Sequence, residues 1–138
     1  MSPTDLSKDS IRHLYTELWN QGNVKLADDL LADDFVHRGN IAPDSLEGST
    51  GYKEFVREIL HGFPDTSVEI VTVIGEGEWV AARWVAHGTH SGEYLGIEPT
   101  DKRVSTSGVS FASIVEGKVV ELWDLYDTDA LLRQLGRR

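Results

Sequence analysis

Apolar residues in the first half of the chain recur at the spacing of helices. The first such stretch predicts a helix that Ser7 or Asp9 caps and Gly22 ends. Its apolar stripe consists of Ile11, Leu14, Tyr15, Leu18 and Trp19. The predicted elements that follow are a short helix at 24–31, an extended segment at 33–37, a loop at 38–50 and a helix at 51–61.

The second half is rich in β-branched residues and predicts four strands and a last short helix. The strands are expected at 67–74, 78–90, 103–115 and 118–126, and the helix at 129–135 after a Thr128 cap. Helices followed by a run of antiparallel strands are typical of α+β proteins. Long strands that contain Gly and Ser predict a curved sheet. We therefore expect one domain over 1–138, a cone-shaped α+β barrel with its helices packed in a curved antiparallel sheet and an open mouth suited to a ligand.

Composition and charge limit the possible partners. The net charge of −10 argues against nucleic acid and anionic membranes, which attract basic surfaces. No cysteine is present, which excludes disulfides, thiolate nucleophiles and Cys-based metal centres. The polar N-terminus lacks the apolar core of a signal peptide, so a cytoplasmic location is expected. The expected partner is a small neutral or apolar molecule, or a second copy of the chain.

Asp124 is the strongest candidate for catalysis. In the fourth strand it shares a face with Val120, Leu122 and Tyr126, which are otherwise apolar neighbours. A carboxyl group on such a face loses hydration and becomes a usable proton donor or acceptor near neutral pH. The alternative is a structural carboxylate at a strand end that binds backbone or an arginine.

The turn at 116–118 decides which residue faces Asp124. A two-residue turn would place Val109 opposite it, and a three-residue turn with Gly117 left-handed would place Ser110 there. We favour the second arrangement. It puts the small residues Thr106, Gly108, Ser110 and Ala112 on the face of Asp124, which would leave room for a ligand.

The histidines do not have the spacing of a metal site. His87 and His90 are three apart in a strand and point to opposite faces, and no metal is expected. His90 lies where a strand meets a Gly-rich loop, a common location for functional residues. The aromatic set is large, and part of it is expected to line a cavity and stack on a flat ligand.

Three stretches of the chain are similar to a known family. The runs GKVVELWDLYD at 117–127 and LLRQLG at 131–136, with GIEPTDKR at 96–103, resemble the SnoaL-like polyketide cyclases. The third run fits the family pattern Gly, hydrophobe, any, Pro, Thr, any, basic, basic. The resemblance covers nearly the whole chain and implies the cone-shaped barrel of nuclear transport factor 2 and ketosteroid isomerase.

The resemblance implies acid–base chemistry on an aromatic polyketide without a bound cofactor. It places the catalytic carboxylate on Asp124 and a family histidine on His90. Our own hypothesis is that His90 or His37 stabilises the developing oxyanion. The family's cyclases close a ring by an intramolecular aldol reaction. The substrate-binding residues that we predict are Tyr15, Trp19, Phe35, His37, Phe55, Ile59, Ser110, Leu122 and Tyr126.

Two departures from the family pattern bear on the reaction. The cyclases carry a histidine at the position of Ser110 and an asparagine at that of His37. Loss of one oxyanion donor costs roughly 3 kcal/mol in such reactions. The altered site favours the family's cyclase-like hydroxylases, with molecular oxygen as co-substrate and a separate quinone reductase as a partner where the reacting species is a reduced quinone.

Three alternatives to hydroxylation stay open. One is aldol ring closure, and another is a non-catalytic module that only binds a small molecule. The third is steroid-type isomerisation or epoxide hydrolysis on the same fold. Isomerisation would use Asp34 and Tyr15, although the Asp33–Asp34 pair has the pattern of a solvated surface. The outer face of the second strand, which carries Trp79, Arg83 and Val85, predicts a homodimer.

Overall fold

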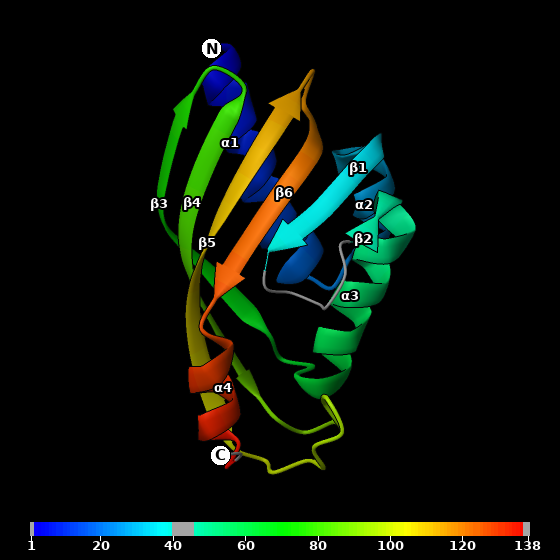
Figure 1. Ribbon diagram of the computed structural model, residues 1–138, viewed down its shortest axis with the longest axis vertical. Coiled ribbons are helices and arrows are strands. Elements are labelled where there is room, and N and C mark those ends of the chain that lie inside the picture. The colour runs from blue at the N-terminus through cyan, green and yellow to red at the C-terminus, as the bar shows by residue number, and fades with distance from the viewer. Residues whose placement is uncertain (1, 40–45, 137–138) are drawn as a thin grey trace.

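The computed structural model describes residues 2–39 and 46–136, and it confirms the α+β class. One curved sheet is backed on one side by helices α1 and α3 (Figure 1). The helical segments are α1 (Pro3–His13), η1 (Leu14–Trp19), η2 (Val24–Leu26), α2 (Ala27–Leu30), α3 (Gly48–Gly62) and α4 (Thr128–Gln134). The strands are β1 (Leu31–Gly39), β2 (Leu46–Glu47), β3 (Ser67–Glu76), β4 (Trp79–Thr89), β5 (Arg103–Val115) and β6 (Lys118–Tyr126).

The first helix begins earlier than the apolar stripe predicts. Its cap is Ser2, whose hydroxyl accepts the Asp5 N–H at 3.1 Å, while the Ser2 N–H donates to the Asp5 carboxylate at 3.2 Å. This capping box and Pro3 at the first turn replace the predicted Ser7 or Asp9 cap. Past α1 the chain widens into the π-helical segment η1, which carries Tyr15 and Trp19. At the other end of the chain, α4 is capped by Asp127 and not by Thr128.

The six strands follow the order β2-β1-β6-β5-β4-β3. The pairs from β3 to β6 are antiparallel, as the run of hairpins predicts. The β1–β6 pair is parallel, and β2, α3, β3, β4 and β5 lie between these two strands in the sequence. Of the predicted loop at 38–50, Arg38 and Gly39 belong to β1, 46–47 form β2, and 48–50 begin α3. Residues 40–45 lie outside the described residues.

The β5–β6 hairpin has the predicted pairing of Ser110 with Asp124, but its turn differs from the predicted one. Glu116 and Gly117 both have positive φ, 51° and 79°, which is the geometry of a two-residue type I′ turn. The strands then slip by one residue between Ser113 and Ile114, which leaves a bulge at Val120. Ser110 therefore faces Asp124 as expected, but the bulge and not a three-residue turn sets this register.

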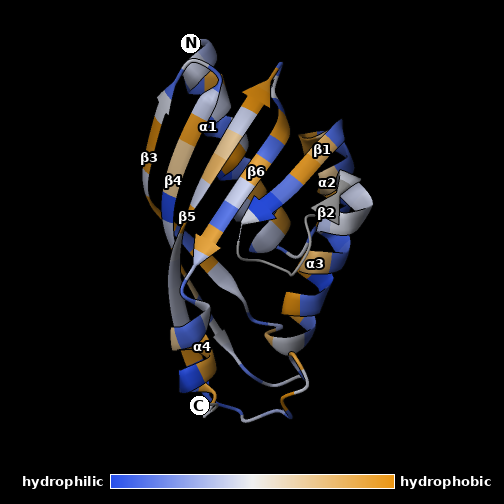
Figure 2. Cartoon of the chain, viewed as in Figure 1, coloured by the Kyte–Doolittle hydropathy of each residue, from blue (hydrophilic) through white to orange (hydrophobic). Residues whose placement is uncertain are grey.

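The core lies between the concave face of the sheet and the helices. Hydrophobic and hydrophilic residues are interspersed along the strands and helices (Figure 2). The buried apolar residues of the helices and of the sheet form one cluster. A second, smaller apolar cluster joins α4 to the end of α3 and the loop after β4. Its members are Phe63, Tyr94, Val104, Leu131 and Leu135. No helix among residues 2–39 and 46–136 is long and apolar enough to span a bilayer.

Candidate active site

Asp124 lies in the middle of the sheet and is only 5% exposed. Ser110 of β5 stands opposite it, and Gly39 of β1 flanks it on the other side. A Cβ at Gly39 would lie 2.0 Å from the Asp124 carbonyl oxygen, and φ at Gly39 is +114°. A side chain at this position would therefore force β1 away from the carboxylate.

Two hydroxyl groups approach one oxygen of the Asp124 carboxylate. Ser110 Oγ donates to Oδ1 at 2.5 Å, and the Tyr15 hydroxyl lies 3.1 Å from the same oxygen. The Tyr15 and Ser110 hydroxyls also bond to each other. Burial, followed by the charge of Asp124, raises the pKa of Tyr15 well above its usual value. Tyr15 is consequently a neutral hydrogen-bond donor at physiological pH.

Trp84 determines which way the Ser110 hydroxyl points. An indole N–H is a donor only, and Trp84 Nε1 lies 2.9 Å from Ser110 Oγ. Ser110 must therefore accept from Trp84, which leaves its own proton for Asp124. The Trp84 ring occupies the space beside Gly108, where a Cβ would lie 2.6 Å from Trp84 Cζ2. The absent side chain at Gly108 thus makes room for the indole and not for a ligand.

His37 holds the second oxygen of the carboxylate. Its Nε2 lies 2.6 Å from Asp124 Oδ2, and the ring is fully buried. The rings of Phe35, Tyr52 and Phe55 surround it, with centroids 4.9–6.1 Å away. His37 Nδ1 has no partner among the described residues. Because a buried N–H without an acceptor is costly, the ring proton belongs on Nε2, which donates to Asp124.

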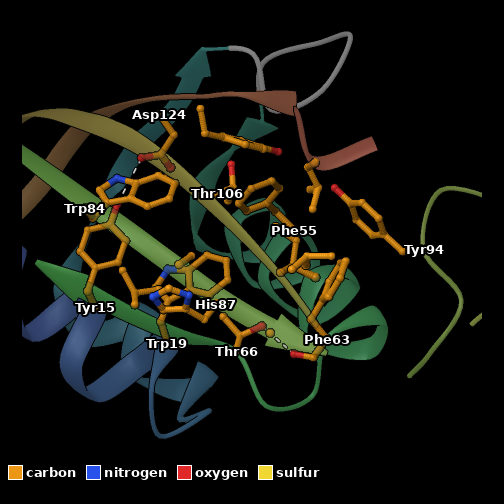
Figure 3. Close-up of a pocket in the computed structure, with 17 residues that line it drawn as sticks. Tyr15, Trp19, Phe55, Phe63, Thr66, Trp84, His87, Tyr94, Thr106 and Asp124 are labelled. Atoms are coloured by element: carbon orange, nitrogen blue, oxygen red, sulfur yellow. Dashed lines mark hydrogen bonds between the residues drawn. The ribbon is translucent and has the colours of Figure 1, made fainter. Parts of the chain in front are cut away.

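A mostly aromatic pocket opens from this carboxylate (Figure 3). Its open mouth and the space between its walls together span about 700 Å³. Asp124 is its sole carboxylate among the described residues, and the accessible surface of the pocket is apolar. The aromatic lining consists of Tyr15, Trp19, Phe55, Phe63, Trp84, Tyr94 and Tyr126.

The structure divides the residues predicted from sequence into four groups. Those that line the pocket are Asp124, Tyr15, Trp19, Phe55, Ile59 and Tyr126. His37 and Ser110 bond to Asp124 from behind the pocket wall. Phe35 and Leu122 are core residues that do not line it. His90 makes no hydrogen bond to Asp124 and is absent from the lining; its ring packs on Phe63.

Several pocket residues were not among the substrate-binding residues predicted from the sequence. Trp84, which lies between Ala82 and Ala86 on the inner face of β4, belonged to the large aromatic set but not to the predicted substrate-binding residues. Phe63 and Tyr94 come from the end of α3 and from the loop after β4, where periodicity carries no signal. Asp34, considered for isomerase chemistry, is exposed on β1. Among the described residues, no group of three or more His, Asp or Glu is arranged to hold a metal ion.

Comparison with known proteins agrees with this geometry. The sequence profile of the SnoaL-like polyketide cyclases matches residues 9–135. Nogalonic acid methyl ester cyclase from Streptomyces nogalater is 32% identical over 120 residues, which cover 83% of this chain and 88% of the relative. Aklanonic acid methyl ester cyclase AcmA from Streptomyces galilaeus is 28% identical over 121 residues, covering 87% and 84%.

Solved structures share the same fold. AclR, a proposed hydroxylase from Streptomyces galilaeus, superimposes with a TM-score of 0.86 at 29% identity, covering 96% of this chain and 97% of AclR. A SnoaL-like protein from Jannaschia sp. CCS1 gives a TM-score of 0.90 at 21% identity, covering 100% and 97%. The second likeness concerns the fold alone.

Proposed function

Because the chain belongs to the SnoaL-like polyketide cyclase family, we propose that it closes a ring of an aromatic polyketide by a cofactor-independent intramolecular aldol reaction. One observation carries the proposal: a single carboxylate, Asp124, lies in the wall of an aromatic pocket with both oxygens held by side chains. The curated relatives, nogalonic and aklanonic acid methyl ester cyclases, support ring closure as the reaction.

In the proposed mechanism Asp124 is the general base. It removes a proton from a carbon next to a carbonyl, and the resulting enolate attacks a ketone carbon of the same molecule. A carbon–carbon bond forms, the ketone becomes an alkoxide, and the proton on Asp124 returns to that oxygen. The product is an isomer of the substrate. Such acid–base catalysis contributes typically 10²–10⁴-fold to the rate.

The pocket wall supports a planar, uncharged substrate. Aromatic side chains surround the space in front of Asp124 and offer stacking surfaces to fused rings. The sequence assigned oxyanion stabilisation to His90 or His37, but neither lines the pocket. Tyr15 is bonded to Asp124 and also lines the pocket, so we assign oxyanion stabilisation to its neutral hydroxyl. The single proton of this hydroxyl turns from Asp124 to the oxyanion once Asp124 has taken the proton of the substrate.

The products formed by the purified protein test this proposal. Nogalonic and aklanonic acid methyl esters are incubated with it in air, and the product masses are measured. Ring closure predicts a product of unchanged mass whose retention differs from that of the substrate. If both substrates bind and neither is converted, the protein is a binding module and the catalytic proposal is wrong.

Hydroxylation is the second candidate, and the likeness to AclR favours it. Molecular oxygen would be the oxidant, and a separate quinone reductase would supply two electrons. One oxygen atom enters the substrate and the other leaves as water. A product that is one oxygen heavier, formed from an already cyclised anthraquinone when a quinone-reducing enzyme is present, would identify this reaction.

We also propose that the chain forms a homodimer through an outer-face patch on the sheet. The patch consists of Trp79, Val109, Phe111, Trp123 and Leu125. Phe111 stacks on Trp79 with ring centroids 4.7 Å apart, yet Phe111 is 47% exposed and Leu125 is 50% exposed. Large apolar patches on a sheet face mark association surfaces, and a second copy offers a matching face.

A further inference from the structure

His90 has no part in the proposed mechanism, although its ring is completely buried. It follows the last residue of β4, and it precedes the loop 91–101 that leads to β5. Its ring packs on Phe63, with centroids 5.4 Å apart at 33°. A proton-transfer residue must reach the substrate, and His90 is absent from the pocket lining.

The hydrogen bonds of His90 fix its protonation. Nδ1 lies 3.2 Å from the backbone N–H of Thr100, which can only donate. Nδ1 is therefore the unprotonated, accepting nitrogen, and the Thr100 hydroxyl, 3.0 Å away, donates to it as well. The ring proton lies on Nε2, which has no hydrogen-bond partner in the part of the chain that the structure describes.

The backbone of His90 binds the same segment. Its N–H donates to the Lys102 carbonyl at 2.9 Å, and its carbonyl accepts the Asp101 N–H at 2.8 Å. Asp101 adopts φ of +58°, an uncommon conformation for a residue other than glycine. Side chain and backbone together thus tie both ends of the loop at one residue.

This loop supplies part of the pocket wall. Tyr94, 6% exposed, lines the pocket and packs edge-on against Phe63 at 5.2 Å. Its position also depends on Gly62, where a Cβ would lie 2.8 Å from the Tyr94 Cβ. An unbroken line of ring contacts therefore runs from His90 through Phe63 to Tyr94, at the end of the pocket away from Asp124 (Figure 3).

We propose that His90 is a positioning residue, whose Nδ1 holds loop 91–101 so that Tyr94 and Phe63 complete the pocket and set ligand affinity. It takes no proton from the substrate. This inference rests on the proposed function only where substrate turnover is measured. Loop exchange and ligand binding can be measured without catalysis.

Two substitutions distinguish the roles of the two ring nitrogens of His90. In His90→Asn the side-chain oxygen can replace Nδ1 as the acceptor of the Thr100 N–H, whereas the Gln side chain of His90→Gln reaches toward Nε2. Hydrogen exchange of the loop amides is measured first, together with the thermal unfolding midpoint. Binding of 1,8-dihydroxyanthraquinone is then followed by quenching of the pocket tryptophans, Trp19 and Trp84.

We expect His90→Asn to behave like the unmodified protein. His90→Gln should speed exchange at Thr100 and Asp101 and weaken anthraquinone binding about tenfold, the effect of losing one buried hydrogen bond. With a substrate that the protein converts, the KM of His90→Gln should rise by the same factor. Its kcat should stay within about threefold of the unmodified value. Thr100→Val, which keeps the backbone N–H and loses the hydroxyl, should give a smaller change of the same kind.

Equal loop exchange and equal binding in the Asn and Gln variants would overturn the proposal. So would a large fall in kcat in both variants together with the loss of one limb of the pH–rate profile, since that result identifies an acid or base. Failure of the proposed function alone would look different. No substrate would be converted, while exchange and anthraquinone binding would still separate the two variants.

Discussion

The Asp124 carboxylate accepts hydrogen bonds from side chains of three different elements. Tyr15 comes from η1, Ser110 from β5 and His37 from β1. Each of these hydrogen bonds helps to fix the orientation of the carboxylate. The hydrogen bond from Trp84 to Ser110 also orients the Ser110 hydroxyl, because the indole N–H can only donate. The site is therefore organised around a base whose position is fixed before a substrate arrives.

Removing donors should loosen the position of this group. We expect Ser110→Ala to lower the rate of ring closure about tenfold, because the carboxylate loses one of the side chains that orient it. Trp84→Phe should lower the rate by less. The double variant should match Ser110→Ala alone, since Trp84 acts through Ser110. Rates of ring closure measured for the three variants check this.

Trp19→Phe provides the matched control for that series. It also removes an indole N–H from the pocket wall, but Trp19 Nε1 donates to the Tyr52 hydroxyl at 2.9 Å and not to the Asp124 network. The rate of ring closure should stay within about threefold of the unmodified rate in this variant. Additive losses for Ser110→Ala and Trp84→Phe would contradict the relay of hydrogen bonds.

Strand pattern alone identified Asp124, because a charged residue on an apolar face is conspicuous. The same pattern could not bring His37 to it. These residues are 87 positions apart and meet only through the parallel β1–β6 pairing, which hairpin rules do not predict. His90, which the resemblance implied as catalytic, shares no hydrogen bond with Asp124, and only three-dimensional contacts reveal its link to Thr100.

At the scale of elements, β1 connects the helices to the base. Its register with β6 places Gly39 beside Asp124 and His37 beside Leu122. The positive φ and the close carbonyl both require glycine at position 39. The sequence showed this glycine only as part of a loop, since one Gly in a polar stretch does not reveal which backbone it will approach.

Gly39→Ala should separate β1 from β6. We expect a loss of roughly 2–4 kcal/mol in the free energy of unfolding, because the new methyl group meets a backbone oxygen that cannot move away cheaply. Denaturant unfolding measures the change. The control is Gly22→Ala, where φ is +66° but the space is open, so only about 1 kcal/mol should be lost. Equal losses in the two variants would show that crowding at Asp124 is unimportant.

The β5–β6 hairpin shows what local turn rules can and cannot predict. Both candidate registers followed from the turn, and the favoured partner, Ser110, is confirmed. The loop length was wrong, because a type I′ turn combined with a bulge gives the same pairing as a longer turn. Bulges depend on packing across the sheet and leave little trace in a single sequence.

At the scale of the whole molecule, the sheet has two different apolar faces. The inner face builds the core and the pocket, while the outer-face patch stays exposed. Arg38 lies 5.8 Å from the Trp123 ring and pairs with Glu121, which gives the patch a charged border. The alternation of residues along β4 predicted that this strand has an outer face. The pairing of aromatic residues on β5 and β6 could not be predicted, because it depends on the register between these two strands.

Phe111→Glu should prevent dimer formation. A charge in the middle of the outer-face patch would be buried without a partner in the dimer, which is strongly unfavourable. Sedimentation velocity should show a monomer for this variant and a dimer for the unmodified protein. Leu6→Glu is the control, because Leu6 is 52% exposed on α1, outside the sheet. A monomeric unmodified protein would refute the proposed dimer.

The most direct test of the account is the rate of ring closure by Asp124→Asn. The substitution keeps the size of the side chain and removes the base. At saturating aklanonic acid methyl ester we predict a rate at least about a hundredfold below that of the unmodified protein, with 1,8-dihydroxyanthraquinone still bound to the pocket. Ring closure at the unmodified rate would show that Asp124 is not the base, and the central claim would be wrong.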